Sequence, residues 1–106
     1  MSWVLVGLAI ALEVAGTTSM KLSDGFTRLT PTLLVFVLYA GAFSLLIVTL
    51  KRLELGITYA IWSGVGTAAT AAIGIFFFAE SAQPLKLLFI GIIIFGVVGL
   101  YVFGER

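Results

Sequence analysis

The chain has 106 residues, of which 61% are hydrophobic and 10% charged, with a formal net charge of +1 at pH 7. A soluble domain of this size would expose most of its apolar surface to water, and a net charge this small offers no basic patch for nucleic acid. The chain has no cysteine, so it can form neither disulfides nor thiolate metal sites, and it has no histidine, the usual metal ligand and proton shuttle. We therefore expect neither a metal nor a cofactor.

Apart from Glu13, the charged residues lie in four short clusters, and long apolar segments separate these clusters. About 20 apolar residues cross a hydrocarbon core of about 30 Å, and each segment has about that length. No connection is long enough to fold separately. The sequence therefore predicts an all-α integral membrane protein, with one domain over 1–106 and transmembrane helices near 3–20, 32–50, 57–78 and 85–103.

The first span carries one carboxylate, Glu13, in an otherwise uncharged apolar segment. Lys21 is eight residues away, about 12 Å along a helix, which is too far for a direct pair. An ionised carboxylate there costs several kcal/mol unless a proton or a cation neutralises it. The competition between a proton and a cation for one carboxylate is the physical basis of a proton-coupled exchanger. Helical spacing predicts that Glu13 shares a stripe with Val6, Ala9, Ile10, Gly16, Thr17 and Met20.

The second and third spans contribute aromatic side chains with polar groups, Tyr39, Tyr59 and Trp62. Aromatic faces attract poorly hydrated organic cations, so together with Glu13 they predict a cation cavity; helix packing or an interfacial belt is the alternative.

Glycines mark the last two spans. Gly64 and Gly66 predict a bend in the third helix or, alternatively, close packing. In the fourth, Gly91, Gly96 and Gly99 favour dimerisation, although strict GxxxG spacing is absent.

Orientation in the membrane follows the excess of Lys and Arg on the cytoplasmic side. With four spans, one face carries Lys51, Arg52 and Arg106, and the other carries Lys21, Arg28 and Lys86. The bias is zero, which predicts insertion in both orientations and an antiparallel dimer of identical chains, an arrangement like the inverted repeats of transporters. The alternative is a single orientation set by another factor.

Two stretches, "LEVAGTTSMKLSDGFTRL" and "GITYAIWSGVG", resemble the small multidrug resistance family, and the resemblance extends over the whole length. It implies an antiparallel homodimer in the bacterial inner membrane that exchanges protons for small organic cations and is powered by the proton gradient. "GTT" and "WSGVG" resemble the branch that exports quaternary ammonium and lipophilic cations rather than the guanidinium-exporting branch. Phe89, where that branch often has glycine, and "LELG", where a proline is common, depart from its pattern.

The resemblance also implies residue roles. Glu13 would bind protons and substrate in turn, and Gly64 and Gly66 would form the bend of the third helix. The implied pocket consists of Tyr39, Phe43, Tyr59, Trp62 and Ser63, with Val6, Ala9, Ile10, Gly16 and Thr17 beside the carboxylate.

Other functions stay open at this point. The chain could export guanidinium compounds, form a non-transporting structural subunit of a membrane complex, or conduct protons or small cations as a channel. Half of an obligate heterodimer is disfavoured, because such halves tend to carry opposite charge biases. No nucleophile–base pair or phosphate loop suggests an enzyme.

Overall fold

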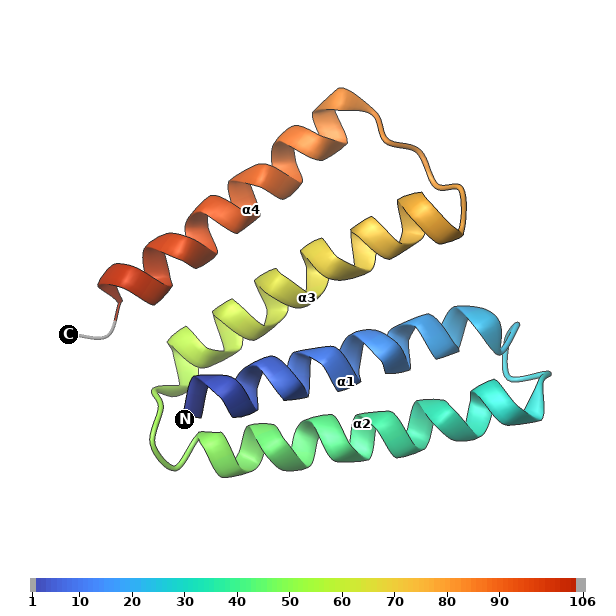
Figure 1. The fold of residues 1–106 in the computed structure, drawn as a ribbon, viewed down its shortest axis with the longest axis horizontal. Coiled ribbons are helices and arrows are strands. Elements are labelled where there is room, and N and C mark those ends of the chain that lie inside the picture. Colours follow the sequence, from blue (N-terminus) through green and yellow to red (C-terminus); the bar gives the residue numbers. More distant parts are fainter. Residues whose placement is uncertain (1, 105–106) are drawn as a thin grey trace. The chain divides into compact units, whose positions relative to one another are not determined.

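A computed structural model describes residues 2–104 and contains four helices in that range: α1 (Ser2–Leu22), α2 (Leu29–Thr49), α3 (Leu55–Phe77) and α4 (Pro84–Phe103) (Figure 1). All four are long and apolar enough to cross a membrane. The prediction of an all-α chain with four spans is confirmed. The largest boundary difference is at α2, which was expected at residue 32 and begins at Leu29. Arg106, used in the charge count, lies outside the described residues.

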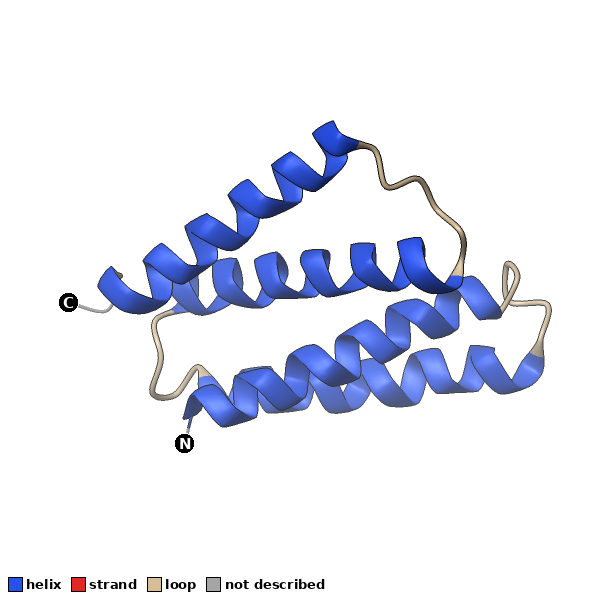
Figure 2. Ribbon diagram, turned by 45° about the horizontal axis from the view of Figure 1, so that its top comes forward, coloured by secondary structure: helices blue, strands red, loops and turns tan. Residues whose placement is uncertain are grey.

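The chain divides into two compact units, Met1–Leu53 and Glu54–Arg106. Each unit consists of two helices joined by a short connection, α1 with α2 and α3 with α4 (Figure 2). A single four-helix domain stays a prediction.

In the first unit, α1 and α2 lie side by side (Figures 1 and 2). Leu12 approaches Gly41, where an added Cβ would lie 3.3 Å from Leu12 Cδ1. On another stripe of α1, Gly7, Ala11 and Ala15 are exposed, whereas Ser19 is buried. The buried apolar side chains of this unit come from both helices. They are Val6, Ala9, Ile10 and Val14 in α1, and Val35, Ala42 and Leu46 in α2.

The connection between α1 and α2 is a tight turn organised by Ser23. This side chain is 1% exposed; its hydroxyl donates to the Met20 carbonyl at 2.7 Å and accepts from the Phe26 N–H at 3.2 Å. Asp24, Gly25 and Phe26 have φ of 49°, 68° and 68°. These left-handed conformations explain the Asp-Gly pair in the sequence, since both residues tolerate positive φ.

In the second unit, α3 and α4 come together near the start of α3 and the end of α4 and diverge toward their connection (Figures 1 and 2). At the close end, Val97 Cγ2 occupies the space that a Cβ on Gly64 would need. Gly64 therefore permits close helix packing, one of the two readings of the glycines in α3. The helix is continuous from Leu55 to Phe77, and the bend at Gly64 and Gly66 stays a prediction.

A second glycine of α3 shapes the end of that helix. The Gly74 carbonyl accepts hydrogen bonds from the N–H groups of Phe78 at 3.1 Å and Glu80 at 3.0 Å. The Glu80 carboxylate occupies the position of a Cβ on Gly74, so a larger residue here would turn this flexible, exposed side chain aside. Pro84 then begins α4, as its fixed φ favours.

Candidate functional site

The helical repeat of α1 places Glu13, Gly16, Thr17 and Met20 on one face, three or four residues apart. Gly16, Thr17 and Met20 each contact Tyr39 of α2, and Glu13 is linked to Tyr39 through Thr17. The carboxylate and the first predicted aromatic side chain therefore belong to one site within the first unit.

Three polar contacts form a continuous chain across this site. The Thr17 hydroxyl lies 2.8 Å from Glu13 Oε2 and 2.6 Å from Tyr39 Oη. Tyr39 Oη lies 3.7 Å from Met20 Sδ, within hydrogen-bonding range for sulfur. Thr18, in contrast, donates to the Val14 carbonyl one turn back at 2.9 Å, which is the usual behaviour of a threonine in a helix. The different bonding of Thr17 shows that the Glu13 carboxyl is its preferred partner.

Gly16 provides the space for the Tyr39 ring. A Cβ added at Gly16 would lie 3.2 Å from both Cδ1 and Cε1 of Tyr39 and 3.5 Å from Leu38 Cβ. Contacts at 3.2 Å are closer than ordinary van der Waals distance, so any side chain here would press on the ring. The glycine thus fixes the distance between the tyrosine hydroxyl and Thr17.

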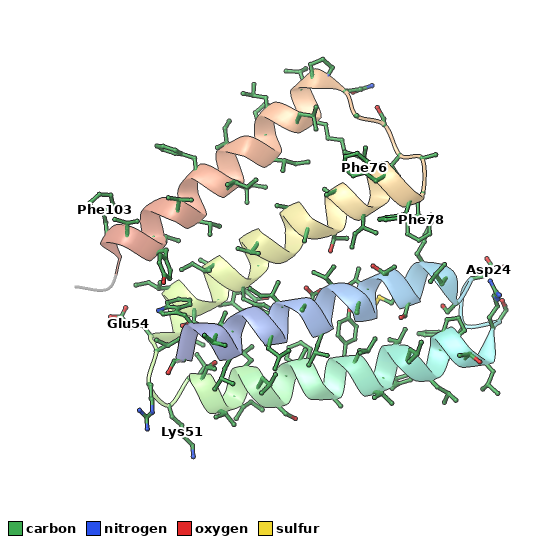
Figure 3. The ribbon with its side chains drawn as sticks, viewed as in Figure 1. Asp24, Lys51, Glu54, Phe76, Phe78 and Phe103 are labelled. Carbon is green, nitrogen blue, oxygen red and sulfur yellow. The ribbon has the colours of Figure 1, made fainter. Side chains whose placement is uncertain are left out.

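The surroundings of Glu13 are apolar and aromatic. Among the predicted pocket residues in this unit, Val6, Ala9 and Ile10 are buried on α1. Phe43 packs on Tyr39 with ring centroids 6.1 Å apart and an angle of 57° between the planes. Of the charged side chains, Asp24, Lys51 and Glu54 lie in the connections at the helix ends (Figure 3).

The remaining predicted pocket residues, Tyr59, Trp62 and Ser63, lie on α3 in the second unit. Tyr59 and Trp62 meet edge to face, with centroids 5.6 Å apart and an interplanar angle of 69°. Trp62 is 6% exposed and Tyr59 is 56% exposed. The Trp62 side chain is therefore buried, whereas more than half of Tyr59 is accessible. Their role in a pocket stays a prediction.

Two residues of interest were not among the predicted pocket residues. Met20 is on the predicted stripe of Glu13, but only the register of α2 against α1 brings it to Tyr39. Thr58, one helical turn before Trp62, is 0% exposed, and its hydroxyl has no hydrogen-bond partner within residues 2–104. The sequence feature that could have identified Thr58 is its position next to Tyr59 and one helical turn before Trp62.

The three glycines predicted for dimerisation lie on a helix with no buried residue in its described range. A Cβ added at Gly91, Gly96 or Gly99 would meet nothing within 4 Å. These positions therefore have no packing role among the described residues of the chain.

Comparison with known proteins gives consistent results. The sequence profile described as Small Multidrug Resistance protein matches residues 1–94. An uncharacterized membrane protein, YvaE, of Bacillus subtilis (strain 168) is 48% identical over 100 residues, covering 94% of this chain and 84% of the relative. The quaternary ammonium compound-resistance protein QacG of Staphylococcus sp. (strain ST94) is 41% identical over 105 residues, covering 99% of this chain and 98% of the relative. A guanidinium exporter of Yersinia pseudotuberculosis serotype I (strain IP32953) is 39% identical over 100 residues, covering 94% and 96%. With four membrane-spanning helices and a profile match over most of its length, the chain is a multi-pass membrane protein that belongs to the small multidrug resistance family of transporters.

Proposed function

We propose that the protein is a proton-coupled antiporter that exports hydrophobic or quaternary ammonium cations, with Glu13 binding protons and substrate in turn. The main support is the environment of this carboxyl. It lies midway along a membrane-spanning helix and, among residues 2–53, its hydrogen-bond partner is the neutral hydroxyl of Thr17. A carboxylate without a bonded cation in an apolar span gains from neutralisation by a proton or by a substrate cation.

The active form is an antiparallel homodimer inserted in both orientations in the bacterial inner membrane. Two observations support this proposal. The Lys and Arg counts on the two faces are equal, and the glycines of α4 have open space around them within the protomer. Close approach of small residues is the usual basis of helix association in membranes.

The substrate class rests on the aromatic pair beside the carboxyl and on the relatives. Tyr39 is linked to Glu13 through Thr17, and its ring packs with that of Phe43 to form an aromatic pair that suits bulky cations with a dispersed charge. The similarity to QacG supports quaternary ammonium cations. Guanidinium export is the second candidate, because relatives named guanidinium exporters are 39% identical to the chain.

Uptake into proteoliposomes under an imposed pH gradient tests the proposal. We expect acidic-inside vesicles containing the protein to accumulate tetrapropylammonium more strongly than guanidinium. Glu13→Gln should abolish this uptake, because the amide cannot exchange a proton. Glu54→Gln, which removes an exposed carboxylate outside the helices, is the matched control and should leave uptake unchanged.

Each outcome has a separate meaning. Uptake of guanidinium with no tetrapropylammonium transport would replace the first candidate with the second. Proton-driven uptake by Glu13→Gln at the wild-type rate would contradict the proposal for both substrates.

Topology can be tested separately because the chain has no native cysteine. Single cysteines at Asp24 and at Lys51 place a thiol in the first and second connections, on opposite faces of the membrane. We expect a membrane-impermeant maleimide to label a fraction of each variant from outside intact cells. Labelling of only one of the two variants would contradict insertion in both orientations.

A further inference from the structure

We propose that Thr17, Tyr39 and Met20 form a hydrogen-bond relay that reverses its direction when Glu13 gains or loses a proton. The relay would satisfy the carboxyl group in both protonation states without moving a side chain. Its part in transport rests on the proposed function of Glu13, but the relay itself depends only on contacts within α1 and α2.

The number of hydrogens available supports this inference. Threonine and tyrosine hydroxyls each have one hydrogen to donate, and each can also accept. Three contacts join the four side chains, from Glu13 to Thr17, from Thr17 to Tyr39 and from Tyr39 to Met20. With Glu13 ionised there are two hydrogens for three contacts, and with Glu13 protonated there are three hydrogens for three contacts.

In the ionised state, the two hydrogens have one good arrangement. Two oxygens 2.6 Å apart require a hydrogen between them, so the Thr17–Tyr39 contact must contain one. The carboxylate can only accept, so Thr17 uses its hydrogen toward Glu13 and Tyr39 donates to Thr17. Both bonds point toward the negative charge, and each strengthens the other. Met20 receives no hydrogen in this state.

In the protonated state, with the hydrogen on the Oε2 atom that faces Thr17, the same contacts run the other way. Glu13 donates to Thr17, Thr17 donates to Tyr39, and Tyr39 turns its hydrogen to the sulfur of Met20. The thioether is a weak acceptor, and it serves this state alone. Reversal requires only rotation of two hydroxyl hydrogens.

The packing holds the heavy atoms in place for this reversal. A Cβ at Gly16 would lie 3.2 Å from two carbons of the Tyr39 ring, so the ring packs directly on the backbone of α1 and has little freedom to move. In the first unit α2 is packed on α1, and the titratable side chain of α2 is Tyr39 itself. On α1 the other charged group is Lys21, two helical turns from Glu13.

Because Met20 accepts a hydrogen bond only when Glu13 is protonated, removing the sulfur should weaken proton binding selectively. Met20→Leu keeps the side-chain volume and removes the acceptor. We expect the protonated-carboxyl signal of Glu13 to appear at lower pH in Met20→Leu than in the wild type, because one weak hydrogen bond to the protonated state is lost. In a Tyr39→Phe background no hydroxyl can donate to the sulfur, so Met20→Leu should not change the pH at which the protonated-carboxyl signal appears.

Infrared titration of the full-length protein in lipid measures this directly. The readout is the C=O band of the protonated carboxyl, taken as the difference from Glu13→Gln at each pH, without substrate. This measurement reports protonation and not transport, so it separates failure of the relay from failure of the proposed antiport.

A second pair of variants isolates Thr17. Thr17→Val removes the central hydroxyl and should also cancel the effect of Met20→Leu, whereas Thr17→Ser should preserve it. An unchanged midpoint in Met20→Leu would overturn the proposal. An equal shift with and without the Tyr39 hydroxyl would overturn it too, because the sulfur would then act through packing alone.

Discussion

The close contact between Gly16 and Tyr39 makes a quantitative prediction for Gly16→Val. A Cβ at this position already lies 3.2 Å from two ring carbons of Tyr39. The γ methyl groups of valine extend about 1.5 Å further, so the ring must move. Movement of the ring breaks the 2.6 Å contact between the Tyr39 and Thr17 hydroxyls, which leads to Glu13. Gly16→Ala requires a displacement of only a few tenths of an ångström and should retain that contact.

The expected size follows from the cost of overpacking. Extra methyl groups in a well-packed site cost typically about 1–3 kcal/mol. Substrate is expected to bind the conformation in which Tyr39 keeps its wild-type position. In the variant, substrate binding must then restore this position and supply the free energy of overpacking. The affinity for a lipophilic cation should then fall about 5- to 150-fold. For Gly16→Ala we expect a smaller loss, within the lower end of that range.

Isothermal titration calorimetry with tetraphenylphosphonium, on protein in detergent micelles, measures these affinities. Gly7→Val is the matched control, because it introduces the same β-branched residue into α1 where a Cβ meets nothing within 4 Å. We expect Gly7→Val to bind with nearly wild-type affinity. Equal weakening by Gly7→Val and Gly16→Val would refute the reasoning, since the loss would then come from helix propensity and not from Tyr39. Wild-type binding by Gly16→Val would refute it as well.

Three predictions concern stability, measured as the midpoint of thermal unfolding by circular dichroism in micelles. Gly64→Ala should destabilise the protein by about 1–3 kcal/mol through overlap with Val97, and adding Val97→Ala should recover most of that loss. Gly74→Ala should displace the exposed Glu80 carboxylate, which is the far end of a flexible side chain, and should change the midpoint little. Gly25→Ala should cost about 1–2 kcal/mol, because φ at this position is +68°.

One control serves both substitutions in α3. Gly56 is exposed on the same helix, and a Cβ there would meet nothing within 4 Å. Gly56→Ala should leave the midpoint unchanged or raise it, since alanine favours helix more than glycine does. A midpoint lowered as much as in Gly64→Ala would contradict the assignment of that loss to Val97. For Gly25→Ala, an unchanged midpoint would contradict the strain argument.

The number of helices and their approximate ends could be predicted from the sequence. Membrane thickness sets the length of each span, and charged residues must lie outside it, so these limits do not depend on which helix packs on which. Glu13 also stood out in the sequence, since a lone carboxylate in an apolar segment needs a neutralising partner; its role in transport stays a prediction. The helical repeat placed Gly16 and Thr17 beside it, and the structure places both against Tyr39.

Periodicity within one helix contains no information about its register against the next. The stripe containing Met20 was predicted, but its contact with Tyr39 depends on how α2 lies along α1. In the same way, the sequence left open whether Gly64 served a bend or close packing, and the position of Val97 identifies a packing role. Apolarity and length thus determined the class of protein, and the isolated charge marked Glu13 as the candidate site residue. The hydrogen-bond partners of that residue were decided by contacts between helices, because the direction and reach of a side chain matter only once its neighbour is in place.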